Sequence, residues 1–424
     1  MPLARRRLLG AAGAAGMAVA ASTFTGCRPL LSWSNPCRSG RLPDELADHP
    51  LVRAAWHGLD ASELWDCHVH LFGSGDSDAG VWINPSMYRW TSPVKVLQRR
   101  FYESAACIGH DRGTIDAKVV ERLVELVDGI QAAAAAAGAG KPKAMLLAFD
   151  WLHDSDGRPD RERSTFHVPN EYTQRTAARH PEQFEWIASI HPYRADAVPA
   201  LETAAANGAR AVNWLPSAMG IDPSDPRCDP FYRSAARLQI PILSHAGEEL
   251  AVDGDERQHY GNPLRLRRAL DSGVRVIVAH CASLGNDVDL DSGPVGPRVS
   301  SFALFARLMS EPRYRDLLLA DVSALPQRNR AAILAAVLEK AEWHPRLLYG
   351  SDYPLPGVIP LFPVSKLADN GWLPAEAVPV LERIREHNAL IFDFVLKRSV
   401  RAGGRAFSDD VFATRRFFPG AAAT

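Results

Sequence analysis

The sequence predicts an α/β fold: a TIM (β/α)8 barrel with a long insertion after its first strand and further helices at its C-terminal end. Two observations carry this prediction. Eight short apolar runs recur along the chain, and nearly all of them end at a histidine, asparagine or aspartate. Near-continuous apolar strands are typical of a parallel sheet whose faces are covered by helices. A length of 424 residues is compatible with one barrel that carries insertions.

The expected strands are spaced as β-α units require. They cover residues 64–70, 144–150, 186–191, 209–214, 240–245, 274–280, 317–321 and 346–352. The later intervals are about 25 to 40 residues, which leaves room for a helix or loop between parallel strands. A doubly wound open sheet is the alternative. It is disfavoured because no Gly-x-Gly-x-x-Gly motif follows an early strand.

Composition divides the chain into four parts. Residues 1–27 are expected to be an export signal, 28–60 a linker with a lead-in helix, 61–371 the barrel, and 372–424 C-terminal helices with a basic tail. The insertion after the first strand contains an aromatic-rich part and an expected helix over 115–137. This insertion fits a lid or substrate wall, and equally a small satellite core.

The first residues resemble a secretion signal. Three arginines, Arg5 to Arg7, precede an Ala/Gly-rich, weakly apolar run, as in a twin-arginine export signal. Small residues then precede Cys27, as at a bacterial lipoprotein cleavage site. We therefore expect an exported protein, periplasmic or anchored to the membrane by a lipid at Cys27. An uncleaved Ala-rich anchor or ordinary cleavage nearby is the alternative.

Charge and cysteine content exclude several classes of protein. The formal net charge is −1, which gives no electrostatic basis for binding nucleic acid or an anionic membrane surface. Six cysteines are too few for a disulfide scaffold in a chain this long. Cys67 and Cys281 lie in apolar runs, which favours inert packing. A disulfide at Cys37 is open, with no partner assignable.

His68 and His70 end the first expected strand, one residue apart. Side chains alternate along a strand, so both imidazoles would point to one face while Cys67 and Val69 point to the other. Two imidazoles on one face can grip one metal ion. Alone the pattern proves little, because with 14 histidines in the chain a chance His-x-His is expected about one time in two.

Polar residues also end the other expected strands. They are Asp150, His191, Asn213, His245, His280, Asp321 and Asp352. In a barrel the carboxyl ends of all strands meet at one rim, which is where active sites lie. A histidine pair on one strand, histidines on three others and an aspartate after the eighth therefore predict a functional site at this rim.

These residues resemble the ligand set of the amidohydrolase superfamily. They are most similar to its amidohydrolase-related branch, which includes 2-amino-3-carboxymuconate-semialdehyde decarboxylase and various metal-dependent hydrolases. The resemblance spans roughly residues 61–400 and is strongest at 66–70, 278–281 and 349–354. It implies a barrel enzyme that depends on a metal.

By this resemblance, the metal ligands are His68, His70, His245 and Asp352, with His280 as an acid/base beside them. Three neutral imidazoles and a carboxylate suit Zn²⁺ and leave a coordination position open for water. Many members of the superfamily bind a second metal through a carboxylated lysine on strand four. The expected fourth strand contains no lysine, so one divalent metal, Zn²⁺, is expected.

Several other residues are candidates to face a substrate, each with a structural alternative. Asn213 and Trp214 occupy the strand that lacks the lysine, where they could orient substrate or simply pack. His191 could line the mouth of the barrel, but a structural role fits it as well. Asp321 carries the same ambiguity.

Two pairs of charged residues are further candidates. Glu248 and Glu249 follow His245 closely and offer an extra base or ligand, although a solvated loop or a helix N-terminus is the interpretation that the sequence favours. Arg89 or Arg99 could hold a substrate carboxylate if the insertion folds over the site.

We expect a metal-dependent hydrolase that acts on a carbonyl-type small molecule, namely an amide, lactone or ester. The metal would activate water and polarise the carbonyl, Asp352 and His280 would move the proton, and His280 would help to stabilise the oxyanion. A metal-dependent decarboxylase of a small unsaturated carboxylic acid is the alternative, against which export argues mildly. A non-catalytic exported binding protein is disfavoured, because an open-coordination site with a candidate base exceeds what binding requires. A homodimer is a further hypothesis.

Overall fold

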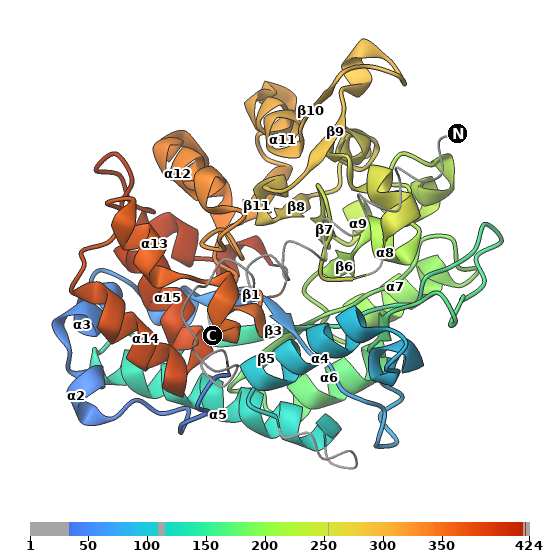
Figure 1. The fold of residues 1–424 in the computed structure, drawn as a ribbon. Coiled ribbons are helices and arrows are strands. Elements are labelled where there is room, and N and C mark those ends of the chain that lie inside the picture. The colour runs from blue at the N-terminus through green and yellow to red at the C-terminus, as the bar shows by residue number, and fades with distance from the viewer. Residues whose placement is uncertain (1–33, 109–114, 253, 419, 421–424) are drawn as a thin grey trace.

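The computed structural model describes residues 34–108, 115–252, 254–418 and 420 (Figure 1). The predicted export signal, 1–27, lies outside these residues. Within the described ranges, no helix is both long and apolar enough to span a bilayer.

Eight parallel strands form the barrel in the described part of the chain. They are β1 (Trp65–His70), β3 (Lys143–Leu147), β5 (Phe184–Ile187), β6 (Val212–Trp214), β7 (Ile242–His245), β8 (Val276–Ala279), β11 (Leu318–Asp321) and β12 (Leu347–Leu348). Two sheets contain them, ordered β1-β3-β5 and β6-β7-β8-β11-β12. Parallel bridges join the sheets at both edges, between Ala188 and Val212 and between Val69 and Tyr353. The predicted TIM barrel is confirmed.

Apolar side chains fill the barrel interior, as the fold requires. The buried members of this inner cluster are Trp65, Cys67, Met145, Leu147, Ile187, Ala211, Leu243, Ile277, Ala279, Leu319, Leu348 and Phe418. Most of them alternate along their strands with residues of the larger outer core, which faces the helices. Phe418 comes from the C-terminal tail and stacks on Trp65, with ring centroids 6.5 Å apart. The tail therefore closes the barrel at the amino ends of its strands.

Strand β1 departs from regular alternation. Its register with β3 shifts between Asp66 and Val69. Cys67 belongs to the inner cluster while Val69 belongs to the outer core, so the expectation that they share a face is wrong. An irregularity of this kind re-aims the side chains that follow it.

The helices surround the strands (Figure 1). They are α2 (Asp44–Ala47), α3 (Pro50–Trp56), α4 (Pro93–Ala105), α5 (Ile115–Ala136), α6 (Asn170–Arg179), α7 (Ala197–Ala206), α8 (Pro216–Met219), α9 (Asp229–Arg237), α10 (Arg267–Asp271), α11 (Ser301–Ser310), α12 (Ala331–Glu339), α13 (Val364–Asp369), α14 (Ala377–His387) and α15 (Ala389–Ser399). Two short antiparallel pairs lie outside the barrel: β2 (Trp82–Ile83) with β4 (Phe166–His167), and β9 (Asn286–Val288) with β10 (Arg298–Ser300).

Helix α15 anchors the end of the eighth strand. Asn388 caps the helix by accepting hydrogen bonds from the N–H groups of Leu390 and Ile391, both at 3.0 Å. The helix is apolar around most of its circumference and is buried. Near its end, the fully buried Lys397 donates to Asp393 at 2.6 Å and to the carbonyl of Gly350 at 2.7 Å. This ion pair fixes the backbone two residues before Asp352.

Two contacts attach the insertion after β1 to other parts of the chain, one just after α4 and one within it. Cys107, just after this helix, forms a disulfide with Cys37 of the N-terminal segment. In the middle of the helix, Gln98 donates to the carbonyl of Ala251 at 2.6 Å, in the loop that follows β7. Because β7 ends at the barrel rim, α4 covers one side of that rim. The free cysteines among the described residues, Cys67, Cys228 and Cys281, are buried.

Candidate metal centre

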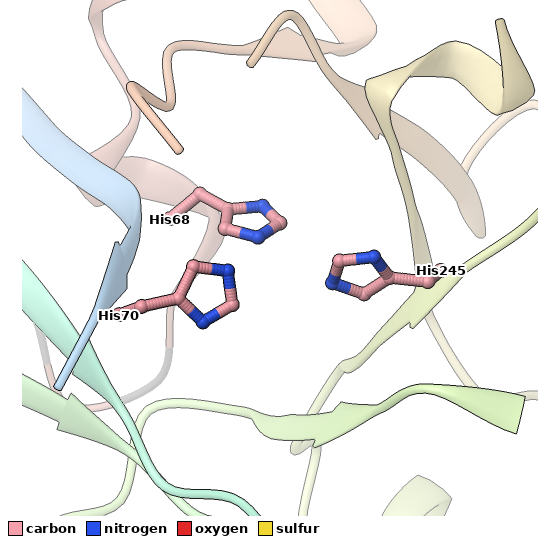
Figure 2. A group of neighbouring side chains, drawn as sticks. All are labelled: His68, His70 and His245. Carbon is pink, nitrogen blue, oxygen red and sulfur yellow. The ribbon is translucent and has the colours of Figure 1, made fainter. Parts of the chain in front are cut away.

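Three histidine side chains converge at the carboxyl rim of the barrel (Figure 2). His68 and His70 extend from β1 toward His245 at the end of β7. The ring centroid of His68 lies 5.1 Å from that of His70 and 5.0 Å from that of His245. One nitrogen of each ring lies within 4.8 Å of the others, a spacing at which all three can bind one ion. The site brings together residues 177 positions apart because the rim joins all strands.

Asp352 completes this cluster from the turn after β12. Its Oδ1 lies 3.1 Å from Nε2 of His70 and 3.5 Å from Nε2 of His68. Burial raises the pKa of Asp352, but the neighbouring His280, His68 and His70 outweigh burial and hold that pKa well below its usual range. Asp352 also has a positive φ of 63°, a conformation that non-glycine residues seldom adopt and that is frequent at functional sites.

The donor atoms fit a divalent cation. Among the described residues, the buried Nε2 atoms of His68 and His245 have no hydrogen-bond partner. A buried ring nitrogen without a partner costs free energy, and a metal ion would satisfy both nitrogens at once. His68, His280 and Asp352 form a second group with ligand atoms within 4.8 Å of one another, so His280 adjoins the same centre.

Asp321, at the end of β11, orients two of these histidines. Its Oδ2 lies 2.9 Å from Nδ1 of His68, and its Oδ1 accepts the backbone N–H of His280 at 2.9 Å. An ionised carboxylate on Nδ1 keeps the proton there and leaves Nε2 of His68 with a lone pair for the metal. The sequence left Asp321 undecided between the mouth and the framework. The structure places it behind His68.

His280 is held by a serine that the sequence did not single out. Its Nδ1 lies 2.7 Å from Oγ of Ser323, and its Nε2 lies 3.9 Å from Oδ2 of Asp352. The hydroxyl of Ser323 also contacts Asp321. The hydroxyl of Ser323 has one proton and donates it in a hydrogen bond to the carboxylate of Asp321. The hydroxyl oxygen must therefore accept a hydrogen bond from Nδ1–H of His280. The lone pair of His280 therefore lies on Nε2, facing Asp352. Burial lowers the pKa of His280 to about 3, while the charge of Asp352 acts in the opposite direction.

The glutamate that approaches the cluster is Glu249. Glu248, the other member of the predicted pair, is exposed. Oε2 of Glu249 lies 3.4 Å from Nδ1 of His245. Burial raises the pKa of Glu249, but the adjacent ring of His245 brings it down to about 2. Adjacent positions in a loop could not be distinguished from composition alone.

Three residues predicted to face substrate make their hydrogen bonds to the framework. Asn213 Nδ2 donates to the carbonyl of Ala148 at 3.1 Å, and Trp214 Nε1 donates to that of Ile190 at 2.9 Å. Trp214 belongs to the outer core. Nε2 of His191 lies 2.9 Å from the carbonyl of Met219. The structure does not bring these three residues into the histidine cluster.

The insertion contributes Tyr102 of α4 to the surroundings of the site. Burial raises the pKa of Tyr102, and the charges of Glu249 and Asp352 raise it further. Tyr102 accepts a hydrogen bond from Gln98 at 3.0 Å. The two arginines predicted to hold a substrate carboxylate lie in other settings than Tyr102. Arg99 pairs with Glu103, and Arg89 is exposed.

A glycine leaves room for His68 on the neighbouring strand end. A Cβ on Gly350 would lie 2.9 Å from Cβ of His68, 3.3 Å from Cβ of Ser323 and 3.4 Å from Sγ of Cys67. None of these atoms is the end of a flexible side chain. The β12 backbone can therefore approach β1 this closely only because position 350 has no side chain.

The amidohydrolase family model matches residues 65–392. This chain belongs to that family. Nothing among the curated proteins matches the chain. A similar solved structure is an uncharacterised TIM-barrel protein from Bordetella bronchiseptica, 18% identical, with a TM-score of 0.44, covering 77% of this chain and 96% of that one.

Two further solved structures are similar to this member of the amidohydrolase family. A probable 2-pyrone-4,6-dicarboxylic acid hydrolase from Acinetobacter baumannii is 14% identical, with a TM-score of 0.39, covering 69% of this chain and 84% of that one. A 5-carboxyvanillate decarboxylase from Sphingomonas paucimobilis is 11% identical, with a TM-score of 0.38, covering 77% of this chain and 96% of that one.

Replacing Asp321 with asparagine tests its contact with His68. We expect Asp321→Asn to weaken metal binding about 10- to 100-fold, because the amide no longer fixes the tautomer of His68. The measurement is competition with a chelator for the bound metal. Asp150→Asn is the matched control, because Asp150 is a buried strand-end carboxylate that binds Arg194 at 3.0 Å instead. Equal metal affinity in both variants would contradict the role of Asp321.

Adding a methyl group at Gly350 tests the close approach of β12 to β1. We expect Gly350→Ala to destabilise the fold by about 1–3 kcal/mol through overpacking and to lower metal affinity by displacing His68. Denaturant unfolding and metal titration measure the two effects. Gly371→Ala is the control for metal affinity, since a Cβ there meets nothing within 4 Å; its φ of 73° strains an alanine, so it is also expected to lose stability without a change at the site. If Gly350→Ala binds metal as tightly as this control, the steric constraint on His68 is absent.

Proposed function

We propose that this member of the amidohydrolase family is a metal-dependent hydrolase that directs water onto a carbonyl-type small molecule, namely an amide, lactone or ester. One observation carries the proposal. His68, whose buried Nε2 has no hydrogen-bond partner among the described residues, belongs both to the ligand group with His70 and His245 and to the ligand group with His280 and the ionised Asp352. His68, His70, His245 and Asp352 would hold one divalent cation, most simply Zn²⁺. Such an ion, when bound, lowers the pKa of water and polarises a carbonyl.

Two residues of the chain would move the proton. The lone pair of His280 lies on Nε2, 3.9 Å from Oδ2 of Asp352. A water molecule placed between these two acceptors would lose its proton to one of them as it attacks the carbonyl carbon. The same group would then return the proton to the leaving atom. Ser323 supports this role, because it holds the ring of His280 in the tautomer that accepts a proton.

The surroundings of the cluster support chemistry on a small molecule. His68, His245, His280 and Asp352 are buried, while a quarter of the His70 side chain is exposed. Helix α4 contacts the loop that carries Glu249. Partial closure of this kind excludes bulk water and strengthens the electrostatic interactions within the site.

Metal analysis with ligand variants tests the proposal directly. We expect the wild-type protein to carry one transition metal per chain, and His68→Ala and Asp352→Ala to lose it. His344→Ala is the control, because His344 is a buried histidine that accepts from the N–H of Ser408, outside the barrel rim. Wild-type protein without stoichiometric metal, or retention of metal in both ligand variants, would refute the site.

The reaction is tested by a screen of lactones, cyclic amides and carboxylated muconate-like acids. Hydrolysis by the wild type, lost in the Asp352→Ala variant, is the expected result. Carbon dioxide release without hydrolysis would refute the hydrolase activity and indicate a decarboxylase that uses the same site residues. Tight binding of a screened compound with no turnover would favour the alternative of a non-catalytic binding protein.

We also propose that the protein is exported, with Cys27 as a lipid attachment site. The disulfide between Cys37 and Cys107 supports this, because disulfides persist in oxidising compartments. Expression in a bacterial host should place the wild type in the membrane fraction and Cys27→Ala in the soluble periplasm. Mass spectrometry would identify the lipid. A cytoplasmic location for the wild type would refute export. The homodimer remains a hypothesis.

A further inference from the structure

We propose that Arg330 is the substrate-binding residue for a carboxylate or similar anionic group next to the metal centre. This inference rests on the proposed function and deepens it by naming a class of substrate: small molecules that carry a carboxylate beside the reacting carbonyl. It is carried by a buried guanidinium whose hydrogen-bonding capacity the described residues leave largely unused.

Arg330 lies in the βα loop between β11 and α12, on the side of the barrel where the metal centre lies. Only 7% of the residue is exposed. Its Nη1 donates to Oγ of Ser283 at 2.8 Å, and the N–H of Ser283 donates to the carbonyl of His280 at 3.0 Å. The guanidinium therefore lies against the turn that presents His280.

The carboxylates whose charges act on Arg330 belong to the metal centre or its surroundings. Burial lowers the pKa of Arg330, while the charges of Glu249, Asp352 and Asp321 raise it. In return, the charge of Arg330 adds to the effect of burial in lowering the pKa of His280. These mutual effects place the guanidinium within the electrostatic reach of the cluster.

Nevertheless, Arg330 forms no ion pair with any described residue, and its buried Nε has no hydrogen-bond partner there. A guanidinium has five N–H donors, and the single bond to Ser283 uses one of them. The carboxylates in reach are engaged elsewhere. Glu249 faces His245, Asp321 faces His68, and Asp352 faces His70.

A buried cation of this kind needs a counter-charge. Burying an unpaired charge is costly, and a guanidinium pairs best with a planar carboxylate through two parallel hydrogen bonds. Gln327, three residues earlier in the same loop, offers a second buried donor, Nε2, that also lacks a partner. The loop thus presents donors without partners among the described residues, while the nearby carboxylates already contact histidines. An anionic group on the substrate is the complement that satisfies it.

A pair of matched probes tests this inference. Benzoate and benzamide have nearly the same shape and differ in charge, and their dissociation constants are measured by calorimetry on zinc-loaded protein. We expect the wild type to prefer benzoate by at least tenfold, and Arg330→Gln to lose at least tenfold of that preference. Arg330→Lys should retain part of it, because lysine keeps the charge and loses the fork geometry.

Arg275→Gln is the matched control. Arg275 is also a partly buried arginine whose pKa is lowered by burial, but it donates to the carbonyls of Phe417 and Gln239 at the opposite end of the barrel. Its variant should keep the wild-type preference. Any direct contact of benzoate with zinc is common to all variants and cancels in the comparison.

An unchanged preference in Arg330→Gln overturns the inference. If that variant does not fold, Arg330→Lys decides by the same ratio, and an unchanged ratio there has the same meaning. Metal content is measured on the same samples. Loss of the preference with full metal content supports Arg330. Wild-type protein that takes up no zinc refutes the proposed function; a preference for benzoate that Arg330→Gln loses would then still support an anion site at Arg330, and an unchanged preference would overturn it.

Discussion

The carboxylate of Asp66 joins the two strand ends on which the metal centre depends. Its Oδ1 accepts the N–H of Ser351 at 2.8 Å and the N–H of His68 at 3.2 Å. The N–H of Asp352 donates to the carbonyl of His68 at 2.9 Å, which closes the barrel at the same point. These bonds determine how closely Asp352 approaches His70. The first and last strands of the barrel thereby form one site.

Behind the cluster, carboxylates determine where protons and lone pairs lie. Asp321 keeps a proton on Nδ1 of His68, and Ser323 transmits the same constraint to His280. Lone pairs on Nε2 of both rings consequently face the centre. Orientation of this kind lowers the free energy of reorganisation during the reaction, because the groups are already in place before a substrate binds.

The site also concentrates negative charge. Asp321, Asp352 and Glu249 have lowered pKa values and are ionised. A divalent cation would compensate most of this charge in a medium of low dielectric. The guanidinium of Arg330 forms no ion pair with the described residues, so its donors would be available to an anionic group of a substrate. The proposed metal site and the proposed anion site would therefore share one buried electrostatic environment.

The sequence by itself determined the barrel and its rim. Eight apolar runs with polar ends follow from local periodicity, and His68, His70, His245, His280 and Asp352 lie at the rim because parallel strands end there together. Such features need only neighbouring residues to be recognised.

The tertiary structure decided what those residues contact. Asp321 and His68 are 253 positions apart, and no local pattern indicates that one orients the other. The choice of Glu249 over Glu248, and the exposure of one against the burial of the other, depends on how the loop after β7 folds. Ser323 and Arg330 are ordinary residues in the sequence. Burial changes the energy of their polar groups, and only the folded chain establishes burial.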